Sequence, residues 1–236
     1  FTVITSATAG EHGMIGSQLD LHRVNADMVG IVTTLDGDIE TRKNELNLEF
    51  QNKASDEFKF KVYDNREVVT QPFTLPGGIV IPVGEYSNNG AMGRLQSSYT
   101  RPYGTVSEIE FQDYYGGEKL RLDVEGSVRP SRYWNLSARY RREDISVPDG
   151  DVTIQIVSLD GVVNFSPDLS VSTQAQYDNI SEGFSLFSRL RWEIRPETEV
   201  FLSFGHGAII RSENFPRDFE SVQSQVVLRF GNRFQF

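Results

Sequence analysis

The chain has 236 residues, a formal net charge of -10 and no cysteine. The lack of cysteine excludes a disulfide framework, a thiolate metal site and a cysteine nucleophile. The acidic balance argues against nucleic acid as a partner, because nucleic-acid binding needs a basic surface. No apolar run approaches the roughly twenty residues of a membrane helix. The length suits one large β-domain, and we expect a single domain over residues 1–236.

The first part of the chain predicts strands that are separated by turn residues. Residues 43–52 show the pattern best, because Leu46, Leu48 and Phe50 alternate with polar residues. Such alternation gives a strand one apolar face and one polar face. We place a break between two strands at Asn25-Ala26-Asp27. The strands expected here are 1–8, 18–24, 28–34, 43–52 and 57–64.

An interruption of about twenty residues follows over 68–89, which is long for a compact domain and marks a candidate functional loop. Its prolines and glycines restrict the backbone of the loop, and its apolar side chains favour packing against other residues. We expect it to fold back onto the strands, either as an external loop or as one that lies in the interior of a barrel. The loop residues of interest are Phe73, Pro76, Ile81, Pro82 and Tyr86.

The rest of the chain predicts nine further strands, which brings the total to about fourteen. Short turns that contain proline, such as Arg129-Pro130-Ser131-Arg132, alternate with turns such as Tyr115-Gly116-Gly117-Glu118. Two alternating kinds of turn are expected at the opposite ends of a meander. The strands expected here are 92–100, 106–115, 119–128, 134–145, 152–165, 169–178, 184–194, 199–209 and 221–236.

Strands of about ten residues that alternate in this way are what a membrane barrel with a polar lumen requires. Aromatic residues near the predicted strand ends, such as Tyr133, Trp134 and Trp192, would form the girdle of such a barrel. We therefore predict an all-β fold, an antiparallel up-and-down transmembrane β-barrel. It could be part of a larger barrel.

The last strand runs to the final residue of the chain and carries alternating aromatics at Phe230, Phe234 and Phe236. An aromatic C-terminal residue on such a strand looks like the insertion signal of bacterial outer-membrane β-barrels. We expect the barrel-assembly machinery to bind it during insertion, and we expect the C-terminus to be periplasmic. The short proline turns would then be periplasmic and residues 68–86 external. The alternative is an edge strand of a soluble sandwich.

Charged residues gather on the inferred inner faces of four strands. A dry interior demands that such charges be paired, whereas a water-filled lumen lets them act as a selectivity lining. Both readings stay open, and an excess of arginine on the last three of these strands would favour anionic solutes. The lumen-lining candidates are Arg121, Asp123, Glu125, Arg139, Arg141, Arg189, Arg191, Glu193, Arg229 and Arg233.

The sequence offers no catalytic constellation, and we expect no metal and no cofactor. Its three histidines, His12, His22 and His206, fall in different predicted elements and lack metal-site spacing. His206, between two glycines, could lie at an outer rim near Ser203 or Ser212, as a membrane-embedded hydrolase would need. The simpler reading is that the glycines ease a strand end.

An ordered set of motifs over roughly two-thirds of the chain carries a family resemblance. It resembles an uncharacterised bacterial outer-membrane family in which a module similar to family 9 carbohydrate-binding modules precedes a porin-like C-terminal barrel. The resemblance implies that this chain is either the C-terminal part of a longer one or an unusually short member, and it implies no reaction. The motifs are residues 71–73, 81–86, 114–117, 176–178, 189–196, 199–201 and 234–236.

We therefore expect an outer-membrane β-barrel that acts as a channel, or as a membrane anchor and docking platform in an envelope complex. The expected partners are outer-membrane lipid, the barrel-assembly machinery and other envelope proteins, with no nucleic acid. The alternatives are an outer-membrane hydrolase with a rim site near His206 and a soluble β-sandwich that binds sugar.

Overall fold

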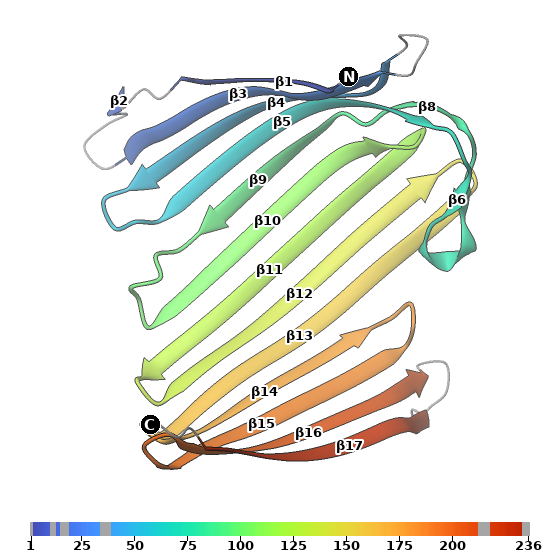
Figure 1. The fold of residues 1–236 in the computed structure, drawn as a ribbon. Helices are drawn as coiled ribbons and strands as arrows, with labels where there is room; N and C mark the ends of the chain where they lie inside the picture. The colour runs from blue at the N-terminus through green and yellow to red at the C-terminus, as the bar shows by residue number, and fades with distance from the viewer. Residues whose placement is uncertain (1, 10–12, 15–18, 34–38, 212–217, 233–236) are drawn as a thin grey trace. The chain divides into compact units, whose positions relative to one another are not determined.

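The computed structural model describes the backbone of residues 2–9, 13–14, 19–33, 39–211 and 218–232, and the side chains of 41–211 and 219–232 (Figure 1). Nearly all of these residues lie in β-strands. In this described part, the helical content is one 3-10 turn, η1 (Pro76–Gly78). No helix among these residues is long and apolar enough to cross a membrane.

The strands follow one another along the chain with few interruptions. The first are β1 (Thr2–Ala9), β2 (Gly13–Met14), β3 (Leu19–Thr33), β4 (Ile39–Asn52) and β5 (Glu57–Val69). After β5 come the short elements β6 (Phe73–Thr74), η1, β7 (Val80–Ile81), β8 (Gly84–Ser87) and β9 (Gly90–Gln96). The long strands that follow are β10 (Tyr103–Tyr114), β11 (Gly117–Ser131), β12 (Trp134–Val147), β13 (Gly150–Ser166), β14 (Leu169–Asp178), β15 (Gly183–Arg195), β16 (Thr198–Arg211) and β17 (Asp218–Asn232).

All the strands except β6 and β7 form one sheet, in the order β1-β3-β4-β5-β9-β10-β11-β12-β13-β14-β15-β16-β17. β6 and β7 pair with each other in a separate two-stranded sheet. β2 pairs with β3, and β8 continues the edge of β5 that β9 occupies. The prediction of fold class is confirmed: this is an all-β, antiparallel, up-and-down sheet of the transmembrane β-barrel type. A soluble sandwich would instead divide these strands between two packed sheets.

Several predicted strand boundaries are wrong: β5 continues to Val69, β9 ends at Gln96 and β11 continues to Ser131. One predicted turn is absent. β3 runs without a break through Asn25-Ala26-Asp27, where the sequence indicated a turn. The register of β3 with β4 shifts between Met28 and Ile31, and such a bulge changes which residues share a face and so disturbs the alternation. The described part still contains fourteen strands of four or more residues, because Gly84–Ser87 forms a separate short strand.

The chain divides into two compact units. The first comprises residues 1–98, 105–124 and 142–154, and the second comprises 99–104, 125–141 and 155–236. Strands β10 to β13 contribute residues to both units.

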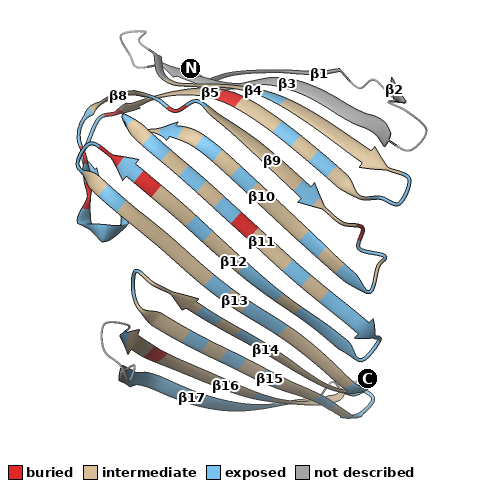
Figure 2. Cartoon of the chain, turned by 180° about the vertical axis from the view of Figure 1, so that it is seen from behind, coloured by how far each residue is buried: buried red, intermediate tan, exposed pale blue. Residues whose placement is uncertain are grey.

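Few of the described residues are buried (Figure 2), and each unit exposes an apolar face. In the first unit, Phe58, Leu95 and Ile109 are 39%, 57% and 54% exposed. In the second, Leu159 is 52% and Leu228 70% exposed. An exposed apolar stripe on nearly every strand is expected where lipid, rather than a protein core, covers the sheet.

Candidate functional site

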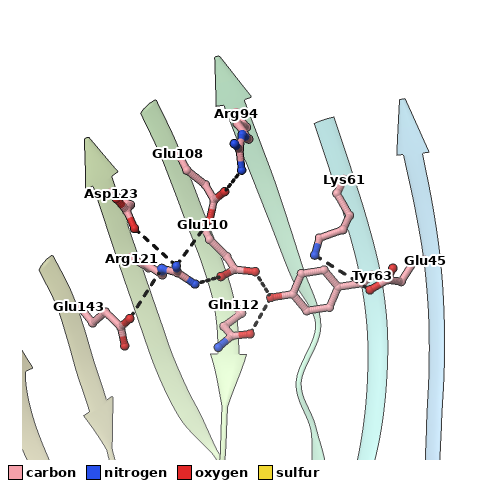
Figure 3. Close-up of polar contacts among 10 residues, drawn as sticks. All are labelled: Glu45, Lys61, Tyr63, Arg94, Glu108, Glu110, Gln112, Arg121, Asp123 and Glu143. Carbon is pink, nitrogen blue, oxygen red and sulfur yellow. Dashed lines mark hydrogen bonds and ion pairs between the residues drawn. The ribbon is translucent and has the colours of Figure 1, made fainter. Parts of the chain in front are cut away.

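The polar face of the first unit carries a charged network centred on Arg121 of β11 (Figure 3). Its guanidinium lies 3.6 Å from the carboxylates of Asp123 and Glu143 and 3.9 Å from those of Glu108 and Glu110. The four carboxylates come from β10, β11 and β12, whose alternate side chains share this face. One guanidinium therefore lies within 4 Å of four carboxylates.

Tyr63 of β5 extends this network across a whole strand. Its phenol lies 2.9 Å from Glu110 and 2.6 Å from Gln112, both on β10. Gly90 of β9 lies directly between Tyr63 and Gln112 in the register. A Cβ atom at Gly90 would collide with the Tyr63 phenol and with the side chain of Gln112. The missing side chain is thus what allows the phenol to reach β10.

Further ion pairs on β4, β5 and β9 continue the same face. Lys43 lies 2.6 Å from Glu45, Lys59 lies 3.4 Å from Glu49, and Arg94 lies 3.5 Å from Glu108. The ion pairs described for this face include seven carboxylates and five cations. The members are Glu45, Glu49, Glu57, Glu108, Glu110, Asp123 and Glu143 with Lys43, Lys59, Lys61, Arg94 and Arg121.

Only Arg121 and Asp123 of this network were among the predicted lumen-lining residues. The alternation of Glu108 and Glu110 with the apolar Ile109 and Phe111 was present in the sequence and could have identified the first two. The contribution of Tyr63 could not be found in that way, because it depends on the register of three strands.

The segment between β5 and β8 packs against the polar-face side of the first unit. Leu75, Ile79 and Ile81 form a buried cluster with Ile145 and Val147 of β12, and Ile81 is 2% exposed. Ile145 and Val147 share their strand face with Glu143 of the charged network. Of the other loop residues of interest, Phe73 is 36% exposed and Pro76 begins η1.

An aromatic cluster fixes this loop to the turn between β10 and β11. The ring of Tyr115 lies edge-on to Phe73, Tyr86 and Tyr114, at centroid distances of 5.3, 5.1 and 4.6 Å. Its hydroxyl donates a 3.1 Å hydrogen bond to Glu67. Burial and the Glu67 carboxylate raise the pKa of the Tyr115 phenol, which keeps it a donor. Tyr86 in turn donates to the Pro82 carbonyl at 2.9 Å.

The predicted arginines of the second unit have different surroundings. Arg191 pairs with Glu199 and lies 3.3 Å from Glu193. Arg189 lies 3.4 Å from the hydroxyl of Ser203. Two carboxylates therefore offset the charge of Arg191.

The remaining predicted residues of the second unit are placed by the register and by a polar pocket. Arg229 of β17 is opposite Phe201, which is opposite Arg191, so the two arginines share a face. Glu125 and Arg139 line a polar pocket, and Arg141 shares the strand face of Arg139.

The final strand alternates as the sequence predicts, up to the end of the described residues. Phe230 is 64% exposed and shares the apolar face of β17 with Val226 and Leu228. The described residues end at Asn232, so they include Phe230 of the predicted insertion signal but not Arg233, Phe234 or Phe236.

His206 lies on the apolar face of β16, whereas Ser203 lies on the polar face opposite Arg189. The Nδ1 atom of His206 is 2.8 Å from the hydroxyl of Ser224 on β17. The sequence could not indicate Ser224, because its position depends on the pairing of β16 with β17. Ser212 is outside the described residues. No group of three or more His, Cys, Asp or Glu residues in the described part could hold a metal ion.

Comparison with known proteins gives remote structural likenesses. No family model and no curated protein matches the chain, so the family resemblance of the sequence motifs stays a prediction. The NanC porin is 10% identical over 84% of this chain and 94% of that chain, with a TM-score of 0.35. OmpT, an outer membrane protein of Vibrio cholerae, is 9% identical over 97% of this chain and 87% of that chain, with a TM-score of 0.36. Neither likeness, at these TM-scores, bears on what the chain does.

Proposed function

We propose that the chain forms the wall of a bacterial outer-membrane β-barrel that acts as a channel. The observation that carries this proposal is the division of one sheet into an exposed apolar face and a charged face. Lipid is the solvent that accepts exposed leucine and phenylalanine on consecutive strands, and water is the solvent that accepts ion pairs such as those of Arg121. The charged face therefore lines an aqueous interior.

The orientation follows from the same proposal. The C-terminus and the short turns that contain proline face the periplasm, and residues 70–83 lie at the external end. The barrel-assembly machinery binds the C-terminal strand during insertion. The buried cluster of Ile81 with Ile145 holds this loop on the charged-face side, where it narrows the path of a solute.

A second candidate is a membrane anchor that docks another envelope protein. The surroundings of Arg121 favour it, because a guanidinium held among four carboxylates braces three strands and would serve a closed interior equally well. We do not propose an enzymatic activity, because Ser203, the serine predicted beside His206, lies on the opposite face of β16.

The test is to purify the whole chain, determine whether it needs detergent, and record single-channel currents in a planar bilayer. We expect a detergent-dependent protein that gives discrete conductance steps. A detergent-dependent protein that is silent in the bilayer would favour the anchor. A monodisperse protein without detergent would overturn both membrane proposals.

A further inference from the structure

A polar pocket of about 400 Å³ lies on the polar face of the second unit. Two rows of side chains across β13, β14 and β15 form its floor. One row is Ser158, Gln176 and Ser185, and the next is Asp160, Gln174 and Phe187. Directly opposed residues of an antiparallel pair have Cβ atoms about 4.5–5.5 Å apart, so each row is a continuous ledge of side chains.

The chemistry of these rows suits a ligand that carries many hydroxyl groups. The amides of Gln174 and Gln176 and the hydroxyls of Ser158 and Ser185 each donate and accept hydrogen bonds, as sugar hydroxyls also do. Asp160 adds an acceptor. A ligand that only accepts, such as a phosphate, would leave half of this capacity unused.

Phe187 and two glycines give the pocket an apolar surface with free space beside it. Phe187 is 39% exposed, and the guanidinium of Arg189 lies 5.4 Å from its ring centroid. The two rows continue onto β16 at Gly205, opposite Phe187, and Gly207, opposite Ser185. A Cβ atom at either glycine would meet nothing within 4 Å. Glycine inside a strand often marks a place where a ligand approaches the backbone closely.

We infer that this pocket binds a neutral, hydroxyl-rich solute of the size of a monosaccharide. The C–H face of the sugar ring packs on Phe187 over the space left by Gly205, and its hydroxyls bond to Gln174 and Gln176. The lining contains two carboxylates, Glu125 and Asp160, and one guanidinium, that of Arg139. A second guanidinium, that of Arg189, lies over Phe187, so the charges balance and the pocket does not select an anion. As a transport site it rests on the channel function proposed above, but binding itself requires no conduction.

The test titrates glucose into the whole chain in detergent and follows binding by saturation-transfer NMR and calorimetry. We expect Gly205→Leu, which fills the free space beside Phe187, to weaken glucose binding about tenfold or more. Gly126→Leu is the matched control, since Gly126 lines an apolar groove of the same unit and has equally free space. We expect Gln174→Leu to weaken binding as well, and Gly126→Leu to bind as the unchanged chain does.

Absence of glucose binding by the unchanged chain, or equal binding by the two glycine variants, would overturn the inference. Tighter binding of glucuronate than of glucose would overturn the assignment to a neutral solute. Bilayer currents recorded on the same preparation separate this inference from the proposed function. A conducting protein that binds no glucose contradicts only the inference, and a silent protein that binds glucose contradicts only the channel.

Discussion

Gly90 shows how one residue without a side chain organises its neighbours. It lies between Tyr63 and Gln112, so a phenol on β5 bonds to residues two strands away. Strand alternation in the sequence identifies the polar face on which these residues lie. Alternation cannot indicate that the Tyr63 side chain crosses over Gly90, because this depends on which residues the register places opposite Gly90.

We expect Gly90→Val to destabilise the protein, because the new side chain would displace the Tyr63 phenol and leave it buried without its partners. The loss should be about 1–3 kcal/mol in the free energy of unfolding, measured by urea titration in detergent. Gly93→Val is the control on the same strand, since the nearest atom to its Cβ is 3.9 Å away on Ile109. Equal losses in the two variants would contradict this role for Gly90.

Arg121 connects three strands through its ion pairs. Arg121→Met would leave four carboxylates close together without their shared cation. Removal of one partner of a largely buried ion pair costs about 3–5 kcal/mol, and we expect roughly half of that here because water reaches part of the cluster. Arg94→Met removes a cation that pairs with Glu108 alone in this network and should cost less. The free energy of unfolding of both variants is measured by the same urea titration. A larger loss for Arg94→Met than for Arg121→Met would contradict the central role of Arg121.

The sequence predicts that the loop between β5 and β8 packs against the sheet, but it does not predict which residues the loop contacts. Its apolar residues and prolines, read from the sequence, indicate that it packs against something. The partners, Ile145 and Val147, lie more than sixty residues further along the chain, and no local pattern connects them to Ile81. The alternation of β12 does place Ile145 and Val147 on the face of Glu143, but it does not reveal what covers them.

We expect Ile81→Ala to loosen the loop without unfolding the sheet, because Ile81 is the most buried residue of the loop cluster. A cavity of this kind costs about 2–4 kcal/mol of packing energy within the loop. Val80→Ala is the control, since Val80 is the neighbouring residue of β7 and is 48% exposed. The measurements are protease cleavage of residues 70–83 and single-channel conductance, both of which should rise for Ile81→Ala. Unchanged cleavage would show that this contact does not hold the loop.

For the whole molecule, strand alternation predicts the two faces of the sheet, because side chains alternate with a period of two. The short turns between strands predict the up-and-down order. The preferred charge of the solute is harder to predict. The arginine excess on the last strands favours anions, yet Arg191 is offset by Glu193 and Glu199. The network of the first unit carries more carboxylates than cations. Pairing across strands, which the sequence does not reveal, thus weakens the argument from arginine excess alone.

We expect Glu110→Gln to shift the ion selectivity toward anions, measured as a change in the reversal potential under a KCl gradient. Glu110 lies 3.9 Å from Arg121 on the charged face, so loss of its charge makes the lining less negative. Asp64→Asn removes the same charge from the opposite face of β5, where Asp64 pairs with Arg42, and should leave the potential unchanged. A reversal potential that is equal in all three proteins would mean that ions do not pass this cluster.

The short connections have a consequence for how the chain reaches its fold. Turns of two residues, such as Tyr115-Gly116 and Pro148-Asp149, join partners that are adjacent in sequence, so each hairpin can close at little entropic cost. Two pairings span longer segments: Val69 meets Gly84 across residues 70–83, and Ala9 meets Val24 across residues 10–23. Closing either segment costs roughly 2 kcal/mol more than closing a two-residue turn. The strands after β9 can thus pair in succession, while these two pairings, which span long segments, divide assembly of the sheet into an early and a late stage.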